Sequence, residues 1–195
     1  MLLKMQLVDA DYFVNANKPV IRLFGKTADG NTVCMLYDKL HPYFYIKLPA
    51  GMSVDNALSK MDGIKEIKDV NIVEKFLSYG YQAHKTKLIK ITLFNPQDVP
   101  AVREKLSNEG IAEDVFEADI LFKYRFMVDN KIYGMQWVEA DCRPEQKTIK
   151  SKVMTYRADA IKPADDIENA ELRYMAFYIE CIPSDTKKPI VAKHD

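Results

Sequence analysis

The run YFYIKL at residues 43–48, followed by SVDNALSKM at 53–61, contains the pattern that decides the predicted fold. The first run is short and rich in aromatic side chains, which is typical of a strand. In the second run, Ser53 can cap a helix, and apolar residues recur at helical spacing as far as Met61. The two runs therefore predict a strand that leads into an amphipathic helix.

The same kind of pattern continues to residue 116. Residues 64–76 and 85–94 are predicted to be strands. Asp98 can cap a second helix, Gly110 can end it, and residues 111–116 follow as a last strand. The order β-α-β-β-α-β is that of the ferredoxin-like split motif. We therefore expect two helices on one face of a four-stranded antiparallel sheet.

A β-meander is predicted before this unit. Its short strands are residues 5–8, 20–24 and 32–37, and its turns are residues 15–19 and 27–31. The class is therefore α+β.

The segments that follow the unit are less regular. Residues 119–128 are predicted to form a short helix rich in aromatic and leucine side chains. A more polar segment then contains a strand-like run at 152–157 and a linker at 162–169. We expect a domain boundary near Asn130, which divides the chain into residues 1–130 and 131–195.

The bulk composition is that of a soluble globular protein. Apolar residues make up 48% of the chain, and Lys plus Arg (28) equal Asp plus Glu (28), so no global charge attracts nucleic acid, although a basic face can still exist. No apolar run approaches the roughly 20 residues of a membrane span, so no membrane contact is expected. The cysteines and histidines are scattered: Cys34, Cys142, Cys181, His41, His84 and His194. This spacing predicts reduced thiols in a cytoplasmic protein, without a disulfide framework or zinc site.

Five runs together resemble one family. They are KPVIRLF at 18–24, PYFY at 42–45, NPQDVP at 95–100, VFEADI at 115–120 and FYIE at 177–180. In this order and spacing, the chain resembles the amino-terminal part of archaeal family B DNA polymerases. The NPQDVP run is the most specific element.

The resemblance implies a pocket that captures uracil from a single-stranded DNA template, in the part corresponding to residues 1–130. The matching pocket positions are Tyr12, Pro42, Tyr43, Pro96, Gln97, Val99, Pro100, Ile120, Leu121 and Phe122, with Arg125 as a contact to a DNA phosphate. Leu121 stands where a proline is usual. Residues 131–195 would then be a partial, exonuclease-like β segment, and the rest of a polymerase or a catalytic subunit would be a partner.

These residue types suit such a pocket physically. Val99 and Pro100 can form a tight apolar floor that excludes the methyl group of thymine. Backbone groups near Tyr43 and Ile120 can pair with the edge of the base. A methyl group is worth only about 1–3 kcal/mol in a pocket, so steric exclusion must contribute much of the discrimination. A template that is already unpaired also lowers the cost of extruding the base.

The FYIE run predicts a buried strand whose catalytic motif is incomplete. Residues two apart on a strand lie on the same face, so an Asp-x-Glu pair there could bind a divalent cation. Tyr178 occupies the first position, and a neutral phenol cannot replace that carboxylate, which leaves Glu180 as a relic ligand. We expect no catalytic residues, metal or cofactor in this chain, whereas the complete enzymes it resembles use Mg²⁺.

Two other interpretations are open. The aromatic residues named above are more often core residues than ligand contacts, and the lysine-rich run at 84–90 alternates like the solvated face of a strand. The chain would then be a ferredoxin-like RNA-binding or protein-interaction module with a vestigial pocket. The third interpretation is an exonuclease disabled at residue 178 and derived from a longer chain.

Overall fold

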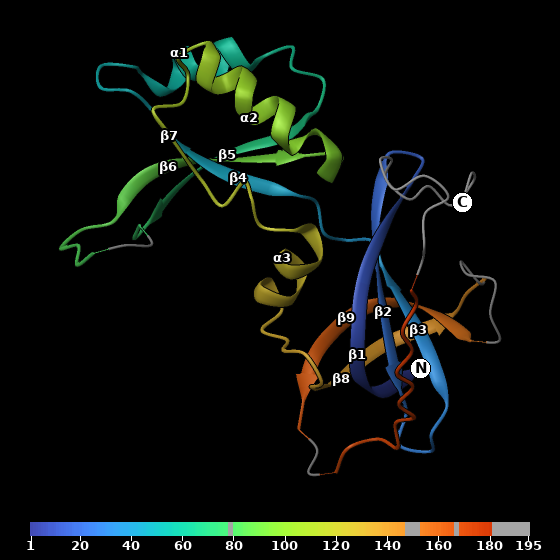
Figure 1. Ribbon diagram of the computed structural model, residues 1–195. Coiled ribbons are helices and arrows are strands. Elements are labelled where there is room, and N and C mark those ends of the chain that lie inside the picture. The colour runs from blue at the N-terminus through green and yellow to red at the C-terminus, as the bar shows by residue number, and fades with distance from the viewer. Residues whose placement is uncertain (78–79, 147–152, 166–167, 181–195) are drawn as a thin grey trace.

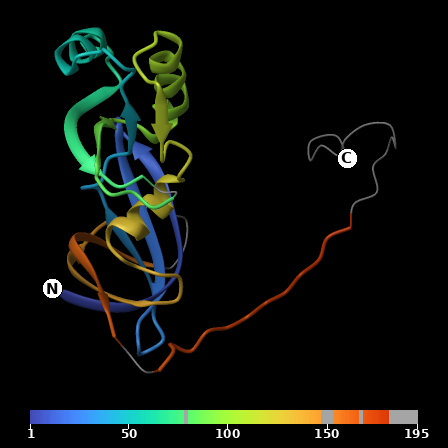
Figure 2. The same ribbon diagram turned by 90° about the vertical axis from the view of Figure 1, so that its left-hand side faces the viewer.

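The computed structural model describes residues 1–77, 80–146, 153–165 and 168–180, which form two sheets joined by one helix (Figure 1). The first sheet is a closed barrel, and the second is a four-stranded sheet with two helices on one face. The joining helix lies between the barrel and the second sheet in both views (Figures 1 and 2).

The barrel begins with the expected meander. Strand β1 (Leu2–Asn15) pairs antiparallel with β2 (Lys18–Lys26), and β2 pairs antiparallel with β3 (Thr32–Tyr37). Ala16 and Asn17, between β1 and β2, have φ values of 47° and 61°. Positive φ at both positions fits a two-residue hairpin turn whose twist matches that of the strands. The meander is confirmed, with strands longer than the sequence predicted.

Strands β8 (Trp137–Pro144) and β9 (Met154–Ala164) close the barrel, in the order β1-β2-β3-β9-β8. β8 pairs with β1, and β9 pairs with β3 in parallel. The boundary expected near Asn130 therefore falls inside one packing unit, because strands on both sides of it are needed to close the sheet. The predicted linker also begins too early, since β9 continues to Ala164.

The second sheet has the predicted β-α-β-β-α-β order. Its elements are β4 (Tyr43–Lys47), α1 (Val54–Met61), β5 (Ile67–Lys75), β6 (Thr86–Leu93), α2 (Val99–Asn108) and β7 (Asp114–Phe116). The strand order is β5-β6-β4-β7 with every pairing antiparallel. One buried cluster joins the inner faces of both helices to the sheet, including Ala57, Leu106 and Ile91.

The two helix starts differ in how they are capped. The Ser53 hydroxyl accepts a hydrogen bond from the Asn56 amide at 3.2 Å, as expected for a cap. Asp98 makes no such bond; instead, Asn95 accepts from the Gln97 amide at 3.0 Å and begins a 3-10 turn, Pro96–Asp98, that leads into α2. Asp98 thus occupies the N-cap position of α2 as predicted, but its side chain makes no capping hydrogen bond.

Helix α3 (Phe122–Asp129) joins the two sheets. Its Phe122 and Phe126 side chains enter the core of the barrel, where they join residues such as Ile21 and Val138. The Phe126 ring lies 5.3 Å from that of Tyr37 and is fully buried. The helix is thus packed as part of the barrel.

The FYIE run does not form the predicted buried strand. Residues 170–180 contain no strand, and residues 173–180 extend away from the barrel with exposed side chains (Figure 2). The exposed fraction is 76% at Phe177 and 69% at Ile179. A buried strand needs a pairing partner and a covering layer, and the described residues supply neither for this run. Residues 181–195, with Cys181 and His194, lie outside the described residues.

No helix in the described part of the chain is both long enough and apolar enough to cross a membrane. Cys34 and Cys142 are buried free thiols.

We predict that Phe126→Ala lowers the free energy of unfolding by about 3–5 kcal/mol, because it leaves a cavity at the centre of the barrel core. The measurement is urea denaturation followed by circular dichroism. Tyr124→Ala on the same helix is the control, since Tyr124 is 50% exposed, and we expect it to cost less than about 0.5 kcal/mol. Equal losses in the two variants would contradict this account of α3.

Candidate functional site

A cavity of about 260 Å³ opens where the starts of β4, α2 and α3 approach β1. We call it the α2–α3 cavity. Every predicted pocket residue except Gln97 lines it: Tyr12, Pro42, Tyr43, Pro96, Val99, Pro100, Ile120, Leu121, Phe122 and Arg125. Gln97 lies in the 3-10 turn before α2 with an exposed side chain. The structure thus brings together residues from four separate segments of the sequence.

The apolar part of the cavity is firmly packed. Pro42, Val99 and Phe122 are buried, and the Tyr12 and Phe122 rings meet edge to face with centroids 5.3 Å apart. Such contacts fix both rings, so their surface facing the cavity has little freedom to adapt. Ile120 and Leu121 are more exposed, at 39% and 60%.

The Tyr43 ring is held in place by contacts on several sides. Its hydroxyl donates to Asp129 at 2.7 Å, and the Arg125 guanidinium carbon lies 4.3 Å from the ring centroid. The Lys90 ammonium lies 3.8 Å from the same centroid. Burial and the Asp129 carboxylate raise the pKa of Tyr43 well above its ordinary value near 10. The phenol is therefore a neutral, fixed wall of the cavity.

Arg125 is buried and paired, which differs from its expected contact with a DNA phosphate. Its Nη1 donates to Glu117 Oε2 at 2.6 Å, and its Nη2 donates to the Glu117 carbonyl at 3.1 Å. Burial, the largest single cause, lowers the pKa of Arg125, but the Glu117 hydrogen bond and the charges of Tyr43, Glu117 and Asp129 together raise it overall. Only 5% of the side chain is exposed. Because these bonds tie the guanidinium to Glu117, Arg125 helps to hold the cavity wall.

The backbone between β7 and α3 forms the other wall. Glu117 has a φ of 62°, in the left-handed region, which turns the chain sharply after β7. Residues 117–120 form a hydrogen-bonded turn, and among the described residues the amides of Ala118, Asp119 and Leu121 have no backbone hydrogen-bond partner. These residues line the cavity, so unpaired N–H donors lie in its wall.

Leu121 retains the backbone shape that a proline would impose. Its φ is −57°, inside the range to which a proline ring restricts this angle. It also precedes α3, where its own amide has no helical partner. The substitution therefore leaves the course of this wall unchanged.

Sequence reasoning missed several residues of the site. Arg103, Glu117, Ala118 and Asp119 also line the cavity, and Asp129 holds the Tyr43 hydroxyl. Arg103 follows Val99 by four residues on α2, so helical spacing could have identified it. Glu117 to Asp119 lie within the VFEADI run already singled out. Nothing in the local sequence indicated Asp129, which reaches Tyr43 across 86 positions.

The incomplete catalytic motif is solvated. The Tyr178 hydroxyl donates to Glu180 Oε1 at 3.1 Å, so the two side chains do share one side of the chain. Within the described ranges, no group of three or more His, Cys, Asp or Glu side chains is arranged to hold a metal ion.

Comparison with known proteins supports the family resemblance. Residues 113–195 match the exonuclease domain of family B DNA polymerases. The chain is 28% identical to DNA polymerase 2 of Aeropyrum pernix over 97% of its length, which is 25% of that protein. It is 31% identical to the DNA polymerase delta catalytic subunit of Arabidopsis thaliana over 91% of its length, or 19% of that protein.

The fold is also found in a solved structure. The family B DNA polymerase of the hyperthermophilic archaeon Pyrobaculum calidifontis superposes with a TM-score of 0.71 at 24% identity, over 88% of this chain and 21% of that one. The chain resembles part of a family B DNA polymerase, and it spans a quarter or less of the relatives named here.

We predict that Tyr43 ionises last among the tyrosines that titrate in the folded protein. Because its folded pKa is raised, its contribution to stability is present below pH 10 and is lost as the pH rises above that value. Ultraviolet titration of Tyr43→Phe should lack the most alkaline part of the phenolate signal. Asp129→Asn should move that part to lower pH, because it removes the carboxylate that disfavours the phenolate. An unchanged titration in both variants would contradict the assignment.

Proposed function

We propose that this chain is the template-binding, amino-terminal part of a family B DNA polymerase and that its α2–α3 cavity captures uracil from single-stranded DNA. The observation that carries the proposal is the convergence of ten predicted residues on one small cavity. Its volume of about 260 Å³ lies below the range of drug-sized ligand sites, which suits a single nucleobase.

The apolar walls supply the discrimination against thymine. Val99 is buried at the start of α2, and the paired rings of Tyr12 and Phe122 are fixed by packing. An added methyl group would have to displace well-packed atoms, which typically costs about 1–3 kcal/mol. This corresponds to a preference of roughly 5- to 150-fold for uracil.

The unpaired amides supply the discrimination against cytosine. Uracil presents carbonyl oxygens that accept hydrogen bonds, whereas cytosine presents an amino donor at the corresponding position. The N–H groups of Ala118, Asp119 and Leu121 can donate to a carbonyl but would oppose an amino group. Leaving such donors unpaired costs about 1–3 kcal/mol each, so the wrong base is rejected by backbone polarity.

Single-stranded DNA is the natural partner for such a cavity. Extruding a base costs least when it is already unpaired. The rest of the polymerase would supply synthesis and its divalent metals, which fits the match of residues 113–195 to an exonuclease domain. If the cavity is vestigial, the chain is instead a protein-interaction or RNA-binding module.

We predict that the chain binds a fluorescein-labelled single strand containing one uracil more tightly than the same strand containing thymine. Val99→Gln should fill the cavity and abolish this preference while weak binding to both strands remains. That residual binding should fall with salt, since it depends on phosphate contacts. Fluorescence anisotropy at moderate salt measures all three.

Two further variants make the test specific. Val99→Ala should admit the methyl group, so that thymine binding rises toward uracil binding. Ala101→Gln, on the exposed side of the same helix, should leave the preference unchanged. Equal affinity of the wild-type chain for the two strands would establish the vestigial-pocket alternative instead.

A further inference from the structure

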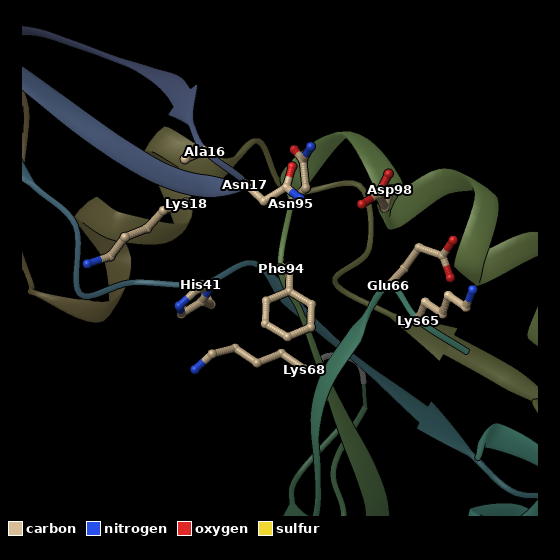
Figure 3. A pocket seen from close by; sticks show the side chains of 10 residues that line it. All are labelled: Ala16, Asn17, Lys18, His41, Lys65, Glu66, Lys68, Phe94, Asn95 and Asp98. Atoms are coloured by element: carbon tan, nitrogen blue, oxygen red, sulfur yellow. The ribbon is translucent and has the colours of Figure 1, made fainter. Parts of the chain in front are cut away.

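A second, larger cavity of about 640 Å³ is lined by the residues labelled in Figure 3. We call it the Phe94 cavity. Its lining comes from the β1–β2 turn, the segment before β4, the start of β5 and the segment between β6 and α2. The Phe94 ring lies at its centre in Figure 3.

The two cavities share the same chain segments. His41, Asn95 and Asp98 line the Phe94 cavity, and the residue after each of them lines the α2–α3 cavity. Consecutive Cα atoms lie 3.8 Å apart. In each of these three segments, one residue therefore lines one cavity and its neighbour in the chain lines the other. A DNA strand with one base in the α2–α3 cavity can therefore run past the Phe94 cavity.

Phe94 is exposed and positioned at the same time. Its side chain is 40% exposed, while its amide donates to the Glu66 carbonyl at 3.1 Å. The His41 ring meets it edge to face, with centroids 6.4 Å apart at 88°. The Phe94 side chain keeps 40% of its surface exposed beside this perpendicular contact, and that surface is available to a planar group.

Exposed lysines line the Phe94 cavity on opposite sides of the ring. In Figure 3 Lys18 and Lys68 lie on the His41 side, whereas Lys65 lies with Glu66 and Asp98 on the other side. Lys18 is paired with Asp38 at 2.9 Å, whereas Lys65 and Lys68 have no ion pair within the described chain. Lys68 is therefore the unpaired cation on the His41 side, where no cavity carboxylate competes with an anionic ligand.

His41 has an unsatisfied polar atom at this place. Its Nδ1 is buried and has no hydrogen-bond partner among the described residues. Burial, together with nearby Lys68, lowers the pKa of His41, so the ring is neutral at pH 7. Since Nδ1 is enclosed by protein, a ligand could reach it only after the ring turns, and a neutral imidazole can then donate from one nitrogen to a phosphate oxygen.

We propose that the Phe94 cavity is a subsite for the nucleotide next to the captured base, with its base stacked on Phe94 and its phosphate between His41 and Lys68. The proposal rests on the proposed function of the α2–α3 cavity and adds a second contact to the same strand. Stacking on an aromatic ring does not depend on the identity of the base. The subsite therefore adds affinity for single strands and no sequence preference.

The stacking contact is tested by removing either the stacked base or the Phe94 ring. Anisotropy is measured for the full chain with a labelled strand containing uracil, and with strands that carry an abasic residue on one side of the uracil. In the wild-type chain, the abasic residue on one side should weaken binding about ten-fold. In Phe94→Ala the normal strand should already bind about ten-fold more weakly, and the abasic residue should cause no further loss.

Controls separate this result from general damage. Phe94→Tyr should restore binding, and Phe76→Ala, which removes another exposed phenylalanine outside both cavities, should have no effect. Circular dichroism of each variant shows that the fold is retained. Equal losses with the abasic strand in wild type and Phe94→Ala, or no loss in either, would overturn the subsite.

The phosphate contact has its own measurement. Lys68→Ala should reduce the slope of log affinity against log salt by about 0.7, the value for one phosphate on a single strand. Lys105→Ala, an exposed lysine on α2 outside both cavities, should leave the slope unchanged. An unchanged slope in Lys68→Ala would overturn this part of the proposal.

The two proposals fail in different ways. Loss of the Phe94 subsite lowers affinity for uracil and thymine strands equally and leaves their ratio unchanged. Failure of the proposed function appears as a wild-type ratio of one, whatever the result with Phe94 and Lys68.

Discussion

The arrangement around the α2–α3 cavity depends on keeping the Arg125 guanidinium paired while it is removed from water. A buried cation without partners is strongly destabilising, and breaking such a pair typically costs about 3–5 kcal/mol. Glu117 supplies both a carboxylate and a carbonyl, and the face of Tyr43 covers the guanidinium. These partners belong to α3, to the turn after β7 and to β4, so one ion pair ties three elements together. Since α3 also inserts Phe126 into the barrel, the pair links the second sheet to the barrel core.

The turn that provides Glu117 has a conformational cost of its own. A residue other than glycine with φ near 60° is strained by about 1–3 kcal/mol, and such residues concentrate at functional sites. The same turn leaves the amides of Ala118, Asp119 and Leu121 without backbone partners among the described residues. The left-handed residue and these amides thus lie in the same wall of the α2–α3 cavity.

Local charge matters more here than total charge. The chain has 28 Lys and Arg residues and 28 Asp and Glu residues. Near the cavities, however, some basic side chains are paired with a carboxylate and others are not. Arg125 and Lys18 are neutralised by Glu117 and Asp38, whereas Lys68 has no ion pair in the described chain. The arginine that the sequence singled out for a phosphate is thus paired within the protein, whereas a lysine on β5 that was not singled out has no ion pair in the described chain. Pairing in three dimensions decides which cations remain available to an anion.

The sequence by itself determined the local elements of this protein. Hydrophobic spacing between residues 43 and 116 predicted the second sheet and its two helices, because helix and strand periods are short-range properties. The NPQDVP and VFEADI runs also contain half of the residues that line the α2–α3 cavity. Tertiary structure alone decided that β8 and β9 close the barrel with β1, that Arg125 is buried against Glu117, and that residues 173–180 remain exposed. Each of these depends on partners distant in the sequence, and neither local propensity nor periodicity specifies which distant strand or charge a residue will meet.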